Sequence, residues 1–460
     1  MNKKISFLTL GCKLNYAETS TYERGFLKEG LETVSWNSGE ADIYLVNTCS
    51  VTEHSDKKCR NIIRKLHRQN PEAAIVVTGC YAQLKREEVA GLDGVIMVFG
   101  AKEKGNVVKD VMGWINGNEA AACLPEDSIE AAAIARNEAE ENGDRTIGTA
   151  QSMAGSGTMH IEAAENVGSM FASYSTGERT RAFLKVQDGC DFKCHYCTVP
   201  YARGESRNIP IAQVIKQANA IAAAGIKEIV ITGVNTGDFG KTTGENFLDL
   251  LKELDKVEGI ERYRISSIEP NLLTEEIVDW IASGTKFQPH FHIPLQSGCD
   301  TILEAMGRRY LTADFRHKIE YIRERMERPS EPEVFFGIDV IVGFPGETDE
   351  LFEETYNFLK DVIKPAFIHI FPYSRRTGTP AASMKNQVQD SVKTERVARL
   401  ESLCNTLHEA FIRRHKGMAE KVLYESTDKH GMMSGYTGNY IRIERPYDAS
   451  LSGQICDIII

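Results

Sequence analysis

The sequence predicts an α/β protein with three folded parts: an N-terminal parallel α/β domain, a central partial (βα)6 TIM-like barrel and a small C-terminal β module. Short apolar runs of strand length alternate with helical stretches over residues 1–115. Six more such runs follow in succession from about residue 180, as in a barrel. The last 40 or so residues alternate with a period of two, which is typical of half-exposed strands.

The composition is that of a folded protein outside the membrane. Of the 460 residues, 42% are hydrophobic and 26% are charged, close to ordinary globular chains. No apolar run reaches the roughly 18 to 20 residues that span a bilayer, and residues 5–10 are too short for a secretory signal. Eleven cysteines in such a chain favour metal ligands, catalytic thiols or buried side chains over disulfides, so we expect a cytoplasmic location.

The N-terminal domain is expected to occupy residues 1–117. Its strands are predicted at 5–10, 43–47, 75–78 and 95–99, and its helices include 16–29 and 55–69. Cys12, Cys49 and Cys80 each follow a strand, at the sheet edge where open α/β sheets place ligands. The three cysteines should therefore converge, although three buried structural cysteines would give the same sequence pattern.

Residues 118–178 are dominated by Ala, Glu, Gly and Ser and are expected to form a linker or insertion, with a possible helix at 130–141. The barrel is expected over 179–385, a connecting helix over 386–417 and the β module over 418–460. The barrel strands are predicted at 182–187, 228–233, 262–268, 290–295, 334–342 and 366–371. Loops after barrel strands carry active sites, so function is expected there.

Cys190, Cys194 and Cys197 form a C-x3-C-x2-C run after the first barrel strand. A cubane cluster takes four ligands, so three thiolates leave one iron open. S-adenosylmethionine could chelate that iron, and electron transfer to its sulfonium would release a 5′-deoxyadenosyl radical. A zinc site completed by His195 is the alternative, but His195 adjoins Cys194 and cannot easily turn to the same metal.

The Cys190 run, with Tyr196 before its last cysteine, resembles the signature of the radical adenosylmethionine superfamily. Residues 186–204 resemble its methylthiotransferase branch, as do the sequences ending in Cys12, Cys49 and Cys80. The resemblance implies two [4Fe-4S] clusters and S-adenosylmethionine as cofactors. It assigns Cys190, Cys194 and Cys197 to the radical cluster. Cys12, Cys49 and Cys80 would hold an auxiliary cluster whose open iron carries sulfur, and all six would be catalytic.

The same resemblance implies that loops after the barrel strands bind S-adenosylmethionine, although several of these polar groups could be ordinary loop residues. Asn235 stands where many relatives carry an acidic group. The candidates are Tyr196, Thr232, Gly233, Asn235, Ser267, Glu269, Gln296 and Val342.

A net charge of −11 disfavours nucleic-acid binding overall, so local positive charge must supply it. The resemblance implies a tRNA substrate, with the C-terminal module similar to the RNA-binding TRAM domain but short for it. Each candidate contact could instead belong to a solvated face or a surface ion pair. These candidates are Lys57, Arg60, Arg64, Arg203, Arg308, Arg309 and Arg442.

Residues 11–16 and 47–52 resemble the branch that methylthiolates C2 of N6-threonylcarbamoyladenosine-37, in the tRNA anticodon stem-loop. The other branches act on N6-isopentenyladenosine or on a ribosomal-protein aspartate. We expect a monomer that uses a flavodoxin- or ferredoxin-like electron donor, with an unidentified sulfur donor. An iron–sulfur electron carrier and an iron–sulfur RNA-binding adapter are the non-enzyme alternatives.

Overall fold

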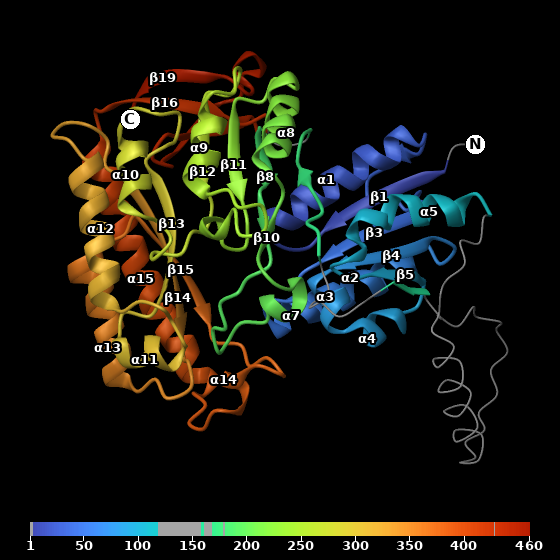
Figure 1. The fold of residues 1–460 in the computed structure, drawn as a ribbon, viewed down its shortest axis with the longest axis horizontal. Helices are drawn as coiled ribbons and strands as arrows, with labels where there is room; N and C mark the ends of the chain where they lie inside the picture. Colours follow the sequence, from blue (N-terminus) through green and yellow to red (C-terminus); the bar gives the residue numbers. More distant parts are fainter. Residues whose placement is uncertain (1–2, 118–157, 161–167, 178–179, 427) are drawn as a thin grey trace.

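The computed structural model describes residues 3–117, 158–160, 168–177, 180–426 and 428–460. Its N-terminal part is one parallel sheet of six strands in the order β2-β1-β3-β4-β5-β6. Figure 1 shows this sheet, in blue, beside the central barrel. The strands are β1 (Lys4–Thr9), β2 (Glu32–Thr33), β3 (Ile43–Thr48), β4 (Ala74–Gly79), β5 (Val95–Phe99) and β6 (Thr158–His160).

Helices cover both faces of this sheet, which is why β3 and β4 are buried along their whole length. Tyr22 and Phe26 of α1 (Lys13–Lys28) pack on one face, together with α5 (Val107–Ile115). Ile63 and Leu66 of α2 (Glu53–Gln69) pack on the other face, with α3 (Cys80–Leu84) and α4 (Arg86–Ala90). The predicted strands and helices of this domain are therefore present within a few residues.

The stretch expected to be a linker contributes two strands. Thr158–His160 adds β6 to the edge of the N-terminal sheet, and β7 (Ser173–Tyr174) pairs antiparallel with the first barrel strand. The expectation of a linker without regular structure is wrong at these two places. The possible helix at 130–141 lies outside the described residues.

The central part is a partial barrel made of two parallel sheets, as predicted. β8 (Arg181–Lys185), β11 (Glu228–Thr232) and β12 (Arg262–Ile265) form one, and β13 (His290–Gln296), β14 (Phe335–Val342) and β15 (Phe367–Pro372) form the other. A parallel bridge between Tyr263 and Phe287 joins their neighbouring edges. The predicted first strand, 182–187, is divided between β8 and the short β9 (Gln187–Asp188).

Helices pack around the outside of the barrel. They pack against the outer face of each strand and form with it a single apolar core, which includes Val214, Leu251, Ile319 and Leu400. These helices are α8 (Ile211–Ala223), α9 (Phe247–Asp255), α10 (Glu275–Ala282), α12 (Thr312–Met326), α13 (Asp349–Asn357) and the long α15 (Asp390–His415), with α11 (Asp300–Ala305) and α14 (Pro380–Ser383) at the end of the barrel where the strands finish. No helix in the described part of the chain is long and apolar enough to cross a membrane.

The C-terminal module is an antiparallel sheet in the order β18-β17-β16-β19, drawn in red in Figure 1. Its strands are β16 (Ala419–Tyr424), β17 (Met432–Thr437), β18 (Arg442–Pro446) and β19 (Ile455–Ile459). Two barrel arginines hold it at the N-terminal ends of the barrel strands. Arg262 donates to the carbonyls of Lys421 and Tyr436, and Arg264 donates to those of Thr437 and Gly438.

The period-two alternation of the last residues predicts a strand with Tyr440, Arg442 and Glu444 on one face, but β18 begins only at Arg442. Tyr440 instead has a φ of 67°, in the left-handed region, within the turn that joins β17 to β18. Its ring turns toward the barrel, where it contacts His290 and stacks on Tyr436. The module therefore presents this tyrosine to the protein interior.

A buried ionic cluster joins the N-terminal domain to the barrel. Glu18 of α1 accepts from Lys104 (2.9 Å), Lys185 of β8 (2.8 Å) and Arg203 (3.3 Å), and both Glu18 and Lys185 are fully buried. Asp188 completes the cluster by pairing with Lys185 (2.6 Å) and Arg203 (2.9 Å). Burial alone would raise the pKa of Glu18, but Lys104, Lys185 and Arg203 outweigh it and lower that pKa.

A second buried contact, at a separate point, links the same two parts. Arg376, in the loop after β15, donates to Ser50 Oγ (2.7 Å) and Asp56 Oδ2 (2.9 Å) at the start of α2. Two ionic contacts at different points fix both the distance and the angle between the domains, which a single contact would not.

We expect Glu18→Gln to lower the free energy of unfolding by about 3–5 kcal/mol, because it leaves buried cations uncompensated. Guanidinium denaturation of the protein without iron–sulfur clusters would measure this loss. Because folding lowers the pKa of Glu18, its contribution is present above its ordinary value of 4.5 and is lost as the pH falls through the lower folded value. The variant should lose less stability than the wild type below pH 4.5.

The matched control is Glu320→Gln, since Glu320 forms an exposed i,i+4 pair with Arg316. An equal loss of unfolding free energy in both variants would contradict a special role for the buried ionic cluster around Glu18.

Candidate active site between the two cysteine triples

Cys12, Cys49 and Cys80 lie at the C-terminal ends of three neighbouring strands, β1, β3 and β4. Gly79 makes this convergence possible. Its φ is 104°, and a Cβ there would lie 2.3 Å from the carbonyl oxygen of Thr48, so only glycine lets β4 end so close to β3. The predicted convergence of strand ends is therefore present.

The surroundings of these three thiols are polar and tightly connected. Burial, followed by the nearby Cys80 and Cys12, raises the pKa of Cys49 to about 12, which reflects how close the three thiols are. Cys12 Sγ contacts Asn15 Oδ1 at 3.2 Å, and Arg203 Nη2 donates to the same oxygen at 2.9 Å. A barrel residue thus reaches the first cysteine of the N-terminal domain through one asparagine.

Cys190, Cys194 and Cys197 lie on the loop after β9, where the barrel rule places a site. Gly189 has a φ of 75°, and a Cβ there would meet the carbonyl of Glu205 at 1.9 Å. Close packing against this returning segment fixes the start of the loop, and Cys190 N donates to Gly204 O at 3.0 Å. The three cysteines line a cavity of about 960 Å³ that also reaches Gln83 and Leu84 of the N-terminal domain.

Neither triple has the spacing of a single-ion site. Among the described residues, only His292, Asp339 and His369 bring three potential ligand atoms within 4.8 Å of one another. Zinc–sulfur bonds of about 2.3 Å in tetrahedral geometry would need sulfurs roughly 3.8 Å apart. His195 Nδ1 is also bonded to Ala305 O at 2.7 Å. Wider triples of cysteines fit a multi-iron cluster, so the donor sets agree with two cubane sites and disfavour zinc.

Arg308 organises the side of the radical triple that faces the barrel. Its guanidinium donates to Cys194 Sγ (3.1 Å), to Tyr310 Oη (2.8 Å) and to Glu269. Tyr196, the residue before the last cysteine, is partly buried and also accepts from Arg308, at 3.4 Å. Glu269 and Tyr196, both predicted cofactor contacts, therefore belong to one hydrogen-bonded group beside the cysteines.

Asn235, after β11, is buried, and neither side-chain amide atom has a hydrogen-bond partner among the described residues. An unpartnered buried amide is costly, so this group fits a polar ligand. Gln187 Oε1 holds the loop by accepting from the backbone NH groups of Val234 and Asn235, each at 2.9 Å. Gly233 leaves room for this arrangement, since a Cβ there would lie 2.9 Å from that oxygen.

Other predicted cofactor residues are placed less directly. Thr232 Oγ1 donates to Val230 O, and the Ser267 carbonyl accepts from Thr236. Gln296 is nearly buried, with a φ of 71° after a register shift in β13, a strained conformation of the kind found at functional sites. The Val342 side chain packs in the core with the outer helices, away from the bore, so its predicted contact is not supported.

The structure places the predicted RNA-contact residues in two groups. Arg203 and Arg308 are buried in the contacts described above and cannot meet a phosphate, so their prediction as RNA contacts is wrong. Arg60 pairs with Glu88 (2.9 Å), and Arg442 pairs with Glu444 (2.7 Å) at the surface. The remaining candidates, Lys57, Arg64 and Arg309, are exposed.

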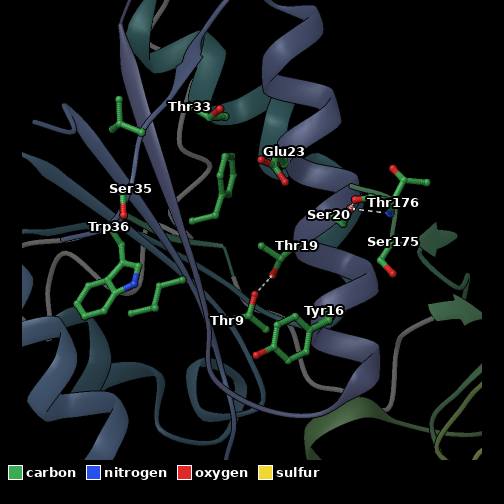
Figure 2. A pocket seen from close by; sticks show the side chains of 13 residues that line it. Thr9, Tyr16, Thr19, Ser20, Glu23, Thr33, Ser35, Trp36, Ser175 and Thr176 are labelled. Atoms are coloured by element: carbon green, nitrogen blue, oxygen red, sulfur yellow. Dashed lines mark hydrogen bonds between the residues drawn. The ribbon is translucent and has the colours of Figure 1, made fainter. Parts of the chain in front are cut away.

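Sequence reasoning missed the buried charges Glu18, Lys104, Lys185 and Asp188, as well as a cavity within the barrel that contains Lys13. A lysine at the end of the apolar strand β8 was the available signal for the ionic cluster. A further pocket, shown in Figure 2, lies between α1, β1 and the 175–176 segment. Hydroxyl groups of Thr9, Thr19 and Ser20 line it, and none of the six cysteines does.

Two family models match the chain: the Radical SAM superfamily over residues 184–359 and Uncharacterized protein family UPF0004 over 4–100. Over 462 residues, the chain is 37% identical to the threonylcarbamoyladenosine tRNA methylthiotransferase MtaB of Bacillus subtilis, covering 99% of this chain and 93% of that protein. The MtaB protein of Aquifex aeolicus is 35% identical, with 96% of each chain covered. The chain belongs to the radical SAM methylthiotransferase family.

The family also includes a tRNA-2-methylthio-N(6)-dimethylallyladenosine synthase of Alkaliphilus oremlandii, which is 30% identical over all of this chain and 90% of its own length. Among solved structures, the radical S-adenosylmethionine methyltransferase TsrM of Kitasatospora setae is similar in fold, with a TM-score of 0.54 and 16% identity. The match covers 83% of this chain and 74% of TsrM, so the fold agrees with that of a radical SAM enzyme.

For a methylthiotransferase with two clusters, we expect about eight irons per chain after anaerobic reconstitution. Replacing Cys12, Cys49 and Cys80 together by Ala should leave about four irons, because only the radical triple would still hold a cluster. Cys456→Ala is the control and should retain about eight. A wild-type content of about four, unchanged in the triple variant, would reject the two-cluster arrangement.

Asn235→Leu should weaken S-adenosylmethionine binding roughly tenfold to a hundredfold, the range expected for losing a hydrogen bond to a charged group. Equilibrium dialysis with the reconstituted enzyme would measure the affinity. Asn405→Leu, at an exposed position on α15, should bind as the wild type does. Equal affinity in the two variants would remove Asn235 from the cofactor site.

Proposed function

We propose that this methylthiotransferase acts on N6-threonylcarbamoyladenosine-37 of tRNA, inserting sulfur at C2 and methylating it. One observation carries the proposal. The two cysteine triples lie beside one domain junction, where Asn15 joins Cys12 to Arg203, the last residue of the helix that follows Cys197. A radical site and a sulfur site at the same domain junction suit a reaction in which one substrate carbon reacts first with the radical and then with the sulfur. Curated relatives covering nearly the whole chain carry this activity in their names.

Within the proposed reaction, the protein binds and orients the reactants. Cys190, Cys194 and Cys197 would hold one cluster, and Cys12, Cys49 and Cys80 the other. When bound, the first supplies the electron that cleaves S-adenosylmethionine, and the second supplies the site for sulfur. Arg308 holds Glu269 and Cys194 in fixed positions.

The exposed basic face of α2 supports RNA binding. Lys57 and Arg64 are exposed on this helix, whose opposite side packs Cys59, Ile63 and Leu66 into the domain core. Phosphates of a stem-loop would meet such a face through counterion release. The small antiparallel module, similar in position to a TRAM domain but short for one, would contact the same RNA.

We also infer that the enzyme works as a cytoplasmic monomer with a flavodoxin- or ferredoxin-like reductant. The exposed rim around the Cys190 cavity, which includes Lys193, offers a docking point for such an acidic electron carrier.

The isopentenyladenosine branch is the competing function, and a neutral, apolar substituent distinguishes its substrate. The cavity described below favours the threonylcarbamoyl form because it contains an unpaired cation.

Nucleoside mass spectrometry of tRNA tests the proposal directly. A host lacking its own enzyme and expressing this chain should accumulate 2-methylthio-N6-threonylcarbamoyladenosine. The same chain with Cys190, Cys194 and Cys197 replaced by Ala should not. Methylthiolated isopentenyladenosine would overturn the substrate assignment. Binding of tRNA without any altered nucleoside would favour an adapter.

A further inference from the structure

A cavity of about 630 Å³ occupies the half of the barrel where the strands begin. All three parts of the protein form its walls. The strands contribute His290, His292 and His369, the start of α1 contributes Lys13, and the C-terminal module contributes Tyr440. Cys12 also lines it, so the cavity borders the auxiliary cysteine site at that residue.

This position suits the substituent of a modified adenine. C2 is an atom of the six-membered ring and N6 is the exocyclic nitrogen on C6, so N1 and C6 lie between them. A base whose C2 faces the auxiliary cysteines would therefore direct its N6 substituent away from them. The cavity inside the barrel is the space that could receive this substituent. Phe335 and Phe367 give this space an aromatic wall.

The charges that line the cavity are paired with one exception. Arg181 bonds Glu425 (3.0 Å), Arg264 bonds Glu228 (2.8 Å) and Arg442 bonds Glu444 (2.7 Å). Asp339, at the edge of the cavity, bonds His292 Nε2 at 2.6 Å. Within the described part of the chain, Lys13 has neither a hydrogen bond nor an ion pair through its ammonium group.

The charged groups around Lys13 act on it without a direct contact to its ammonium. Burial lowers the pKa of Lys13, and Arg181 lowers it further, while Tyr440 and Asp339 partly oppose them. Burial also lowers the pKa of His369 to about 4 and that of His290 well below its ordinary value, and Lys13 contributes to both shifts. Both imidazoles are therefore neutral hydrogen-bonding groups at pH 7.

A partly buried ammonium that lines a cavity without a partner is unfavourable unless a ligand supplies the opposite charge. The cavity thus matches a ligand that carries one carboxylate and some neutral polar groups but no further charge. A threonylcarbamoyl group has these features: one carboxylate, one hydroxyl and a urea. An isopentenyl group has none of them and would leave the lysine unpaired.

We propose that Lys13 pairs with the carboxylate of the N6 substituent of the target adenosine, so that the enzyme selects an anionic substituent over a neutral one. This inference rests on the proposed function and identifies the residue that sets its substrate preference. The paired arginines and the neutral histidines would shape the site, and Lys13 would supply its charge.

The test compares two synthetic stem-loop RNAs, one with threonylcarbamoyladenosine and one with its carboxamide, which is nearly the same size but neutral. With reconstituted enzyme, kcat/KM for the acid should exceed that for the amide roughly tenfold to a hundredfold. Lys13→Gln should bring this ratio close to one, and Lys13→Arg should keep part of the preference. RNA affinity, measured by fluorescence anisotropy without S-adenosylmethionine, should follow the same order.

Lys28→Gln is the matched control, since Lys28 is an exposed lysine at the other end of α1. It should keep the wild-type ratio. Iron content of each variant shows whether both clusters remain. If Lys13→Gln reduces turnover of acid and amide equally, or changes neither, Lys13 does not read the carboxylate. If the wild type modifies only isopentenyladenosine RNA, the proposed function itself fails, a result distinct from equal use of acid and amide.

Discussion

The buried contact of Glu18 with Lys104, Lys185 and Arg203 is the interaction on which the two-site arrangement depends. Glu18 lies on the helix that begins beside Cys12, and Arg203 ends the helix that follows Cys197. An ion pair between these helices therefore sets the separation of the two cysteine triples. Apolar packing could hold the same domains, but it is non-directional, and hydrogen-bonded charges fix an orientation more narrowly.

The second constraint is backbone conformation beside the cysteines. Gly79 and Gly189 each precede a cysteine, and both have positive φ with no room for a side chain. Each glycine fixes the point where a strand passes into a cysteine segment, so the first thiol of that segment has a defined position. Arg308 adds a third restraint by bonding Cys194 directly. The cofactor side of the site is therefore positioned by strand ends, glycine turns and one buried arginine.

Much of this could be predicted from the sequence, because apolar periodicity and cysteine spacing are local signals. The strands, the partial barrel and the convergence of Cys12, Cys49 and Cys80 follow from them. Burial of charge is not a local signal. Arg203 and Arg308 read as possible phosphate contacts because sequence does not tell a paired guanidinium from a free one, and the Val342 side chain, predicted as a cofactor contact, lies in the apolar core. Tyr440 left the expected strand because a tight turn carries it inward.

The attachment of the C-terminal module has a consequence for how such proteins could exchange parts. Arg262 and Arg264 bind backbone carbonyls of the module. The position of the module on the barrel therefore depends on these two arginines and on the backbone path of the turn at 437–438. These bonds use backbone oxygens and involve no side chain of the module. A homologous module with the same turn could be transplanted onto this barrel. Its residue at the position of Tyr440 would then line the cavity that contains Lys13.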